Sequence, residues 1–318
     1  MSNEPAVPPR PPAISFAIPY YRNVAYLLET IKSVRNQTIA DWELIVVDDA
    51  GPEPAHDLVD AIGDSRISYV RNVTNLGLAR NWNECVRLSR APLVNVVHAD
   101  DRLHPDYAAR VLDAAARHPD AAAVFTDVTI IGPDGEPTRT LPDLAKRLVP
   151  RPRHDHELAG DRSLAGLLAG NYILCPTLCL RPAIVGTAPF DPRWRFVPDQ
   201  AFTVGQLLAG RTLHSIRSPL LEYRRHESSQ TSALTSDSSR FEEELEFSRQ
   251  MAGEAAARGW TRSARAARWR ILTRTHLLLR IGLDLVGRRF GAAQQKRRIL
   301  WSDLRHRDRV GADDPNPQ

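Results

Sequence analysis

Short apolar runs alternate with longer segments of helical periodicity from residue 13 to residue 131, and this alternation constrains the fold more than any other feature. Strands are predicted for AISFAIP (13–19), WELIVVDD (42–49), RISYVRN (66–72), PLVNVVHAD (92–100) and AAAVFTDVTII (121–131). Helices are predicted between them for NVAYLLETIKSVRNQ (23–37), LGLARNWNECVRLS (76–89) and PDYAARVLDAAARH (105–118). Such an order is typical of an α/β fold with a mostly parallel central sheet flanked by helices.

The rest of the chain divides by composition. Residues 1–12 are proline-rich and are predicted to form a disordered or extended tail, and residues 132–160, rich in Pro, Gly, Asp and Arg, a loop or flexible cover. Helices at 160–170 and 197–211 and a strand at 212–226 are predicted next. After the break TSDSS (235–239) only helical patterns remain. We therefore expect one domain at 13–237, with halves at 13–131 and 132–237, followed by a basic helical region at 238–318.

The charge of the chain is unevenly distributed. The formal net charge of the 318 residues is +4, while residues 261–318 hold 14 Arg or Lys against 5 Asp or Glu, so this end carries +9 and the remainder −5. The basic, amphipathic segment 268–290 is predicted either to pack as a helix on the core or to contact anionic lipid head groups. No nucleic-acid partner is predicted.

The cysteines and the hydropathy of the chain indicate the cellular compartment in which the protein is expected. The chain has three cysteines, an odd number without the spacing of a disulfide framework, and no basic-then-apolar secretory segment opens it. No uninterrupted apolar stretch reaches the ~18 residues that a membrane span needs. These features predict a cytoplasmic protein, with peripheral contact at the inner face of the membrane if segment 268–290 binds lipid.

Two acidic pairs stand where predicted strands end. Asp48 and Asp49 close one apolar run, and Asp100 and Asp101 close another. One interpretation is structural, in which the acids turn the chain or cap the next helix. The other is functional, because ligands of open α/β sheets gather at the carboxyl ends of the strands, and clustered carboxylates repel unless a cation lies between them. Oxygen ligands suit Mg²⁺ or Mn²⁺ holding the phosphates of a nucleotide diphosphate.

Ordered sequence blocks resemble glycosyltransferase family 2. The blocks are IPYYRN (18–23), SVRNQTIADWELIVVDDAG (33–51), RNVTNLGLARNWN (71–83), VVHADDRLHPDY (96–107), NYILCPTLCLRPAI (171–184), VPDQAFTVGQLLAG (197–210) and LLEYRRHESSQT (220–231). The resemblance implies a GT-A fold, in which a nucleotide-sugar-binding half precedes an acceptor-binding half. It also implies inverting transfer of a sugar from a nucleotide diphosphate donor, UDP-sugar being the first choice, to a hydroxyl of a glycan, lipid-linked or other acceptor.

The resemblance assigns a nucleotide-binding role to several positions. Pro19, Tyr20 and Tyr21 match the loop that lies against the base and the ribose. Asp48 and Asp49 match the acidic pair of which one carboxylate accepts a hydrogen bond from the base. In another block, NLGLARN, Arg80 matches a residue that supports the nucleotide loop or a phosphate.

The family's D-x-D slot is filled by His98, Ala99 and Asp100. Asp100 matches the acid that ligates Mn²⁺ or Mg²⁺. Histidine in the first place departs from the family pattern; its imidazole could hydrogen-bond a hydroxyl or, when neutral, ligate the metal. Asp101 is predicted either to hold the metal ligands in place without binding the metal itself or to cap the following helix.

The acceptor half supplies the predicted catalytic base. Asp199 matches the carboxylate that takes the proton of the acceptor hydroxyl as it attacks the anomeric carbon from the face opposite the leaving diphosphate, which inverts the configuration. Pro198 stands where the family often has an acid. His226, with Arg224 beside it, matches a histidine near the diphosphate and the metal, so Asp100 and His226 are the predicted metal ligands.

Three other functions compete with this interpretation. A response-regulator receiver ends its first strand on an acidic pair, whereas here the pair follows the second. A nucleotidyltransferase would be expected to have a glycine- and arginine-rich loop after the first strand, where this chain has PYYRN. A non-catalytic relative that binds nucleotides or sugars stays open because of His98.

Overall fold

The computed structural model describes residues 10–138, 152–226 and 238–312, and side chains as far as residue 305. The chain forms two compact units. Unit 1 comprises residues 1–129, 175–189 and 214–223, and unit 2 comprises 130–174, 190–213 and 224–318. Two segments of the predicted acceptor half thus belong to unit 1. The predicted tail lies mostly outside the described residues, as does part of the predicted cover at 132–160.

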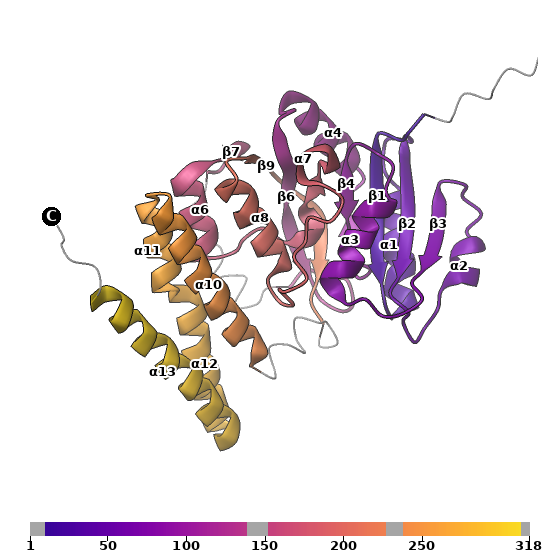
Figure 1. The fold of residues 1–318 in the computed structure, drawn as a ribbon. Coiled ribbons are helices and arrows are strands. Elements are labelled where there is room, and N and C mark those ends of the chain that lie inside the picture. Colours follow the sequence, from indigo (N-terminus) through magenta and orange to yellow (C-terminus); the bar gives the residue numbers. More distant parts are fainter. Residues whose placement is uncertain (1–9, 139–151, 227–237, 313–318) are drawn as a thin grey trace, which may run out of the picture. The chain divides into compact units, whose positions relative to one another are not determined.

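Four parallel strands make up the first part of the sheet, in the order β3-β2-β1-β4 (Figure 1). They are β1 (Ile14–Tyr20), β2 (Trp42–Asp48), β3 (Ile67–Arg71) and β4 (Val94–Val96). Every residue of β2 and β4 is buried, as expected of strands covered on both faces. The α/β fold expected from the sequence is confirmed.

Helices cover both faces of these strands. They are α1 (Val24–Arg35), α2 (His56–Asp60), α3 (Leu78–Leu88) and α4 (Tyr107–Arg117). Alternate residues of β1, such as Phe16 and Ile18, share one core with Leu27 of α1 and Val111 of α4, because side chains of a strand alternate between its faces. Helix α3 packs on β1, β2 and β4 from the other face (Figure 1).

The remaining strands extend the sheet with antiparallel pairs. They are β5 (Arg102–Leu103), β6 (Ala121–Ile131), β7 (His156–Leu158), β8 (Cys179–Leu180) and β9 (Thr212–Arg224). From β4 the order continues β8-β6-β9-β5, and β7 also pairs with β9. The β4–β8, β6–β8 and β5–β9 pairs are antiparallel. Parallel pairing therefore joins the first four strands, whereas antiparallel pairing joins β8 to its neighbours and β5 to β9. Short elements near β8 are a 3-10 turn at Cys175–Thr177 and α7 (Pro182–Val185).

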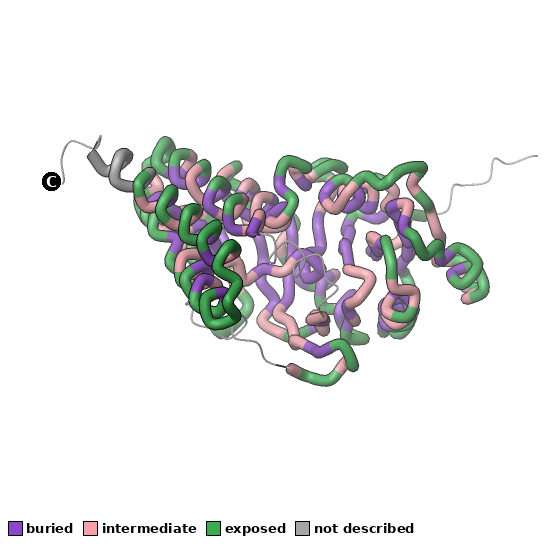
Figure 2. The backbone as a smooth tube through the Cα atoms, turned by 90° about the horizontal axis from the view of Figure 1, so that it is seen from below, coloured by how far each residue is buried: buried purple, intermediate pink, exposed green. Residues whose placement is uncertain are grey.

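Unit 2 is mainly helical among its described residues. Its helices are α6 (Gly160–Ala169), α8 (Pro198–Leu208), α10 (Ser239–Ala257), α11 (Thr261–Trp269), α12 (Ile271–Val286) and α13 (Phe290–Ala312). Helix α11 packs on α6 and α10, and α12 packs on α13. The helical extension predicted for the C-terminal region is confirmed. Figure 2 shows buried residues along the strands and many exposed ones on the C-terminal helices. No helix of the described residues is long and apolar enough to cross a membrane.

Candidate active site

The parallel pairing brings the carboxyl ends of four strands to one edge of the sheet. Tyr20 pairs with Asp48, and Asp48 pairs with Arg71, so the last residues of β1, β2 and β3 form a row. Strand β4 joins this edge, because the Val97 amide donates to the Ala17 carbonyl at 3.1 Å and the chain then turns. The two acidic pairs thus follow β2 and β4, whose carboxyl ends lie on either side of β1 at the edge where ligands of such sheets bind.

Asp48 is completely buried and holds the turn that follows β2. Its Oδ1 accepts a 2.8 Å hydrogen bond from the Gly51 amide. Its Oδ2 accepts from the Tyr69 hydroxyl and from Nη1 of Arg71, whose Nη2 donates to the Gly51 carbonyl at 2.9 Å. Burial and the bond to Asp48 raise the pKa of Tyr69, so the phenol remains a donor. Sequence reasoning missed Tyr69 and Arg71, although both lie in β3 beside the acidic pair.

Gly51 also brings the first loop against this turn. A Cβ at residue 51 would lie 1.7 Å from the Tyr21 carbonyl oxygen, a separation that only glycine permits. Tyr20 is buried and donates to the Glu53 carbonyl at 2.6 Å, and burial together with Glu53 and Asp48 raises its pKa. Tyr21 is 44% exposed. Of the two tyrosines predicted to lie against the base, only Tyr21 presents its ring to solvent.

Asp49 connects the end of β2 to the start of α3. Its Oδ1 accepts from the Leu76 amide at 2.7 Å and from Nδ2 of Asn72 at 3.0 Å, and its Oδ2 accepts from the Gly77 amide at 2.9 Å. Asn72 also donates to Oδ1 of Asn81 in α3 at 2.9 Å. With three donors on a carboxylate that is 5% exposed, Asp49 fixes the loop at 72–77. Sequence reasoning missed both asparagines.

Two more predicted nucleotide contacts lie near this edge. Pro19 is half-buried in β1, next to the row of strand ends. Arg80 is exposed in the first turn of α3, the helix whose start Asp49 fixes. Arg80 is thus placed on the helix that follows the loop at 72–77, and its predicted contact with the nucleotide stays a prediction.

His98, Asp100 and Asp101 form a cluster with the chemistry of a metal site. Each offers one ligand atom within 4.8 Å of the others. Nε2 of His98 is buried and makes no hydrogen bond with the described part of the chain, while Nδ1 lies 3.9 Å from Oδ2 of Asp101. Burial lowers the pKa of His98, against the opposing effect of Asp100, and the neutral imidazole is the ligating form. The donor set fits a divalent cation such as Mn²⁺ or Mg²⁺.

Neighbouring side chains fix this cluster in place. The ring of Trp82 stacks on the ring of His98 with centroids 5.2 Å apart. Thr30 in α1 donates to the Asp101 carbonyl at 2.7 Å, and Ser33 accepts from the Leu103 amide at 3.1 Å. The buried carbonyls and amides of the loop after β4 therefore have partners, which lowers the cost of burying that loop. Polar residues on the buried face of a helical pattern were the signal for Thr30 and Ser33 in the sequence.

The predicted base, Asp199, is the second residue of α8 in unit 2. Its side chain is half-buried, and its Oδ1 accepts from the Gln200 amide at 2.8 Å. The backbone entering α8 is held by Glu243 of α10, whose Oε1 accepts from the Phe196 amide at 2.6 Å and the Val197 amide at 3.0 Å. Sequence reasoning missed Glu243, which lies outside the blocks that resemble the family.

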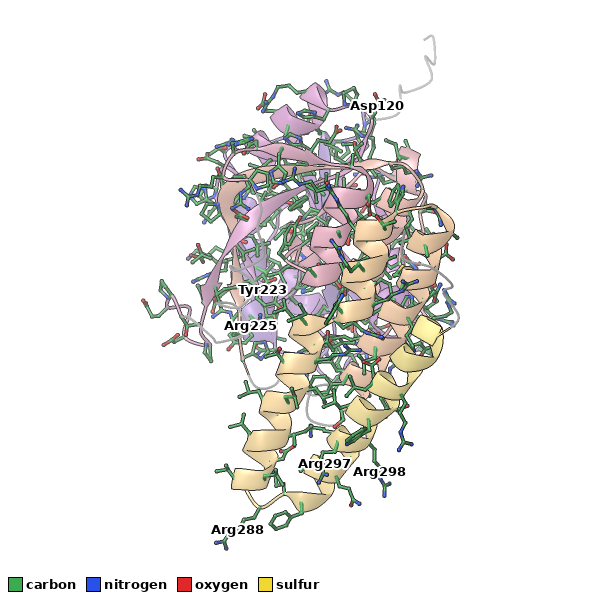
Figure 3. The ribbon with its side chains drawn as sticks, turned by 90° about the vertical axis from the view of Figure 1, so that its left-hand side faces the viewer. Asp120, Tyr223, Arg225, Arg288, Arg297 and Arg298 are labelled. Carbon is green, nitrogen blue, oxygen red and sulfur yellow. The ribbon has the colours of Figure 1, made fainter. Side chains whose placement is uncertain are left out.

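The predicted diphosphate residues lie at the end of β9 and just beyond it. Arg224 is 2% exposed and its Nη1 donates to the Pro133 carbonyl at 2.9 Å, which is a structural contact. The next residue, Arg225, binds the Ile131 carbonyl through its amide at 2.8 Å, and Figure 3 shows it beside Tyr223. His226 follows and is half-buried. The diphosphate roles of Arg224 and His226, and the metal role of His226, stay predictions.

Comparison with known proteins extends this picture. The family model described as Glycosyl transferase family 2 matches residues 15–167. The candidate glycosyltransferase EpsH of Bacillus subtilis (strain 168) is 25% identical over 225 residues, covering 69% of this chain and 62% of EpsH. The O-antigen biosynthesis protein RfbC of Myxococcus xanthus is 34% identical over 137 residues, covering 42% of this chain and 11% of RfbC.

A solved structure shows the same fold. The crystal structure of S. aureus TarS 1-349 in complex with UDP-GlcNAc aligns with a TM-score of 0.59 and 18% identity, covering 76% of this chain and 66% of the TarS chain. The chain thus spans less than two thirds of each of these three proteins. The structural likeness confirms the predicted GT-A fold.

Proposed function

The chain belongs to glycosyl transferase family 2, and from this premise we propose that it is an inverting, metal-dependent glycosyltransferase that moves a sugar from a nucleotide diphosphate donor to an acceptor hydroxyl. UDP-sugar is the proposed donor class, supported by the UDP-GlcNAc in the TarS structure of similar fold. Polysaccharide or glycan biosynthesis is the proposed setting, supported by the O-antigen role in the name of RfbC.

One observation carries this proposal: the cluster of His98, Asp100 and Asp101 follows the same sheet edge as the Asp48 row. In a doubly wound sheet that edge is where a nucleotide binds, with its phosphates near the ends of the strands. A divalent cation held by Asp100, with His98 and Asp101, would balance the negative charge of the diphosphate as the nucleotide leaves. The cluster therefore supports a donor with a diphosphate.

The acidic pair at 48–49 is proposed to shape the nucleotide loops. Both carboxylates are buried and already accept protein donors, so their contacts support a structural role in holding Tyr21 and the loop at 72–77. A base lying on Tyr21 would then meet a surface that is fixed before the ligand arrives. The hydrogen bond that one of these carboxylates would accept from the base stays a prediction.

Asp199 is proposed as the general base. Its half-buried carboxylate lies in the first turn of a helix, where the Gln200 amide binds Oδ1, which supports a role as acceptor of the hydroxyl proton. Assistance of this kind is worth ~10²–10⁴-fold in rate. In this step the acceptor oxygen would form a bond to the anomeric carbon as its proton passes to Asp199. The bond from that carbon to the diphosphate oxygen would break, and the nucleotide diphosphate would leave with the bonding pair.

Nucleotide binding tests the donor site. Thermal unfolding is measured with UDP, GDP, dTDP and CDP, each with and without Mn²⁺. Ligand at ~100 times its dissociation constant should stabilise the folded protein by ~2.7 kcal/mol, a shift of several degrees. A shift with one nucleotide and Mn²⁺ supports the proposal and identifies the donor class. Lack of a shift with all four contradicts it.

Two variants separate binding from transfer. Asp100→Ala should lose the Mn²⁺-dependent part of the shift, whereas Asp106→Ala, which removes an exposed acid near the same strand end, should keep it. Asp199→Ala should keep the shift and lose release of UDP from UDP-GlcNAc with a panel of sugar acceptors, and Asp191→Ala is its control. Full turnover by Asp199→Ala would overturn the base assignment. A nucleotide shift with no turnover by the unaltered protein would favour the non-catalytic relative.

A further inference from the structure

The solvent-facing side of α12 is apolar. Ile271 is 64% exposed, Leu278 56%, Leu279 50%, Leu283 48% and Val286 86%. None of the charged side chains in the 16 residues of α12 is exposed, because Asp284 is buried and Arg274 and Arg280 are half-buried. A helix that lies on a protein core normally has the opposite pattern, with charges outward and leucines inward. This outward side, with Leu285, is called the α12 face below.

Two of the three charged side chains of α12, Asp284 and Arg274, are paired with residues of α13. Asp284 lies 2.8 Å from Nζ of Lys296, with both side chains at most 3% exposed. Arg274 binds Asp303 of α13 at 2.8 Å, and Arg270 joins the same carboxylate. Buried ion pairs contribute little net stability compared with apolar packing. The inner side of α12 therefore holds these ion pairs beside the buried Leu277 and Ile281, while the leucines of the α12 face are exposed.

The segment that contains the α12 face, residues 261–305, exposes bases and no acid. Both acids between residues 261 and 305, Asp284 and Asp303, are buried. The exposed bases of the same segment are Arg262, Arg265, Arg268, Arg288, Arg289, Arg297, Arg298 and Arg305. Figure 3 shows Arg288 at the turn between α12 and α13 and Arg297 and Arg298 along α13, with their side chains directed away from the ribbon. Next to Arg288, Phe290 is 65% exposed.

We propose that the α12 face, with the turn at 286–290, docks on a membrane surface that carries anionic lipids. The leucines would enter the boundary between head groups and acyl chains, and the arginines would bind the lipid phosphates. Exposed Trp269 and Trp301, in α11 and α13, suit the same interface. At ~24 Å, this helix is shorter than the ~30 Å hydrocarbon core of a bilayer, so it would lie along the surface. This proposal is independent of the proposed transferase activity.

A lipid surface fits the charge better than a second copy of the chain does. Two copies joined through this face would bring arginines of like charge together, because the segment exposes no acid between residues 261 and 305. An anionic membrane supplies the opposite charge at every position. Exposed apolar area of this extent marks an interaction site rather than ordinary surface.

Co-sedimentation with vesicles tests the proposal. The full chain is mixed with vesicles of phosphatidylcholine alone or with roughly one third phosphatidylglycerol. We expect sedimentation with the second kind only. Arg288→Ser/Arg297→Ser/Arg298→Ser should weaken this binding on the order of 100-fold, because each base near the surface is worth about a factor of five. Its control, Lys32→Ser/Arg110→Ser/Arg153→Ser, removes three exposed bases elsewhere and should bind as the unaltered chain does.

The apolar contribution is tested in the same assay. Leu279→Ser/Leu283→Ser should weaken binding about tenfold or more, with the unfolding temperature nearly unchanged because both side chains are already exposed. Leu28→Ser/Leu58→Ser is the matched control in α1 and α2. Vesicle binding that is absent, or equal for all of these variants, would overturn the proposal. A dimer seen by analytical ultracentrifugation, and dissociated by Leu279→Ser/Leu283→Ser without any lipid binding, would instead assign the face to a second copy.

Discussion

Replacing Asp49 with alanine separates a residue that shapes the nucleotide loop from one that binds the ligand directly. Asp49→Ala removes the acceptor of the Leu76 and Gly77 amides and of the Asn72 side chain. Because the carboxylate is almost fully buried, these donors lose a charged partner and regain only partial contact with water. The loop at 72–77 should therefore loosen even when no nucleotide is present.

The magnitude follows from the number of bonds. A hydrogen bond to a charged group contributes ~1.5–3 kcal/mol, and the contributions do not add fully. Leu76 is 38% exposed, so water can replace part of what is lost, and about 3 kcal/mol is expected for the three bonds together. Asp49→Asn keeps one acceptor oxygen and should lose about half of that. Asp57→Ala, at a fully exposed carboxylate in α2, should change the stability by less than ~0.5 kcal/mol.

Amide hydrogen exchange measures the effect where it occurs. About 3 kcal/mol of local stability corresponds to exchange on the order of 100-fold faster at the Leu76 and Gly77 amides, while the amides of β1 should change less. The unfolding temperature should fall by ~6–12 °C. If Asp49→Ala kept both protection and unfolding temperature yet lost the UDP-induced shift, the shaping role would be wrong and Asp49 would bind the base itself.

Three further perturbations test other parts of the structure. Gly51→Ala should lower the unfolding temperature and abolish the nucleotide-induced shift, because the added Cβ would clash with the Tyr21 carbonyl. The control is Gly166→Ala in α6, where an added Cβ has no neighbour within 4 Å, and it should be neutral or stabilising by up to ~1 kcal/mol. Glu243→Ala releases the backbone before Asp199, so it should lower kcat by up to ~10²-fold while the nucleotide-induced rise in unfolding temperature stays unchanged. Glu243→Gln should keep much of the rate. Glu246→Ala, at an exposed position on the same helix, is the control. Burial, with Arg240 nearby, lowers the pKa of His276 from 6.5 to about 4, so the unfolded chain takes up a proton before the folded chain does as the pH falls below 6.5. Urea unfolding should therefore show that the free energy of unfolding falls by about 2 kcal/mol between pH 7 and pH 5. The variant His276→Gln should lack this loss. Equal pH dependence in that variant would contradict the His276 assignment.

Much of unit 1 was predictable because its signals are local. The apolar run at 42–49 could only be a buried strand, and it is β2 in the structure. The acids at its end were visible in the sequence, and their place at the ligand edge followed from the parallel order of the strands. Two-residue strands such as β5 and β8 could not be predicted, because two residues show no periodicity and are strands only through their partners.

The partners of the site residues could not be predicted either. Arg71 reaches Asp48 from the neighbouring strand, and Trp82 stacks on His98 from a helix. Glu243 accepts from two backbone amides before Asp199 that lie 47 and 46 positions earlier in the chain. Each contact joins residues that are distant in sequence, so no local pattern specifies it. The resemblance to family 2 covered the acids themselves and left out the C-terminal region in which Glu243 lies.

The sequence by itself determined roughly where the longer helices and strands lie along the chain and which residues carry charge, because periodicity and turn chemistry are properties of neighbouring residues. Only the tertiary structure decided which side of each helix is inside. Segment 268–290 was predicted to be amphipathic, and either face could have been buried. In the structure Asp284 pairs with Lys296 and Arg274 with Asp303, so these charged side chains face inward beside the buried Leu277. The exposed leucines of α12 are Leu278, Leu279, Leu283 and Leu285. The physical reason is that a periodic pattern defines two faces of a helix, while the partners that cover one of them come from elsewhere in the chain.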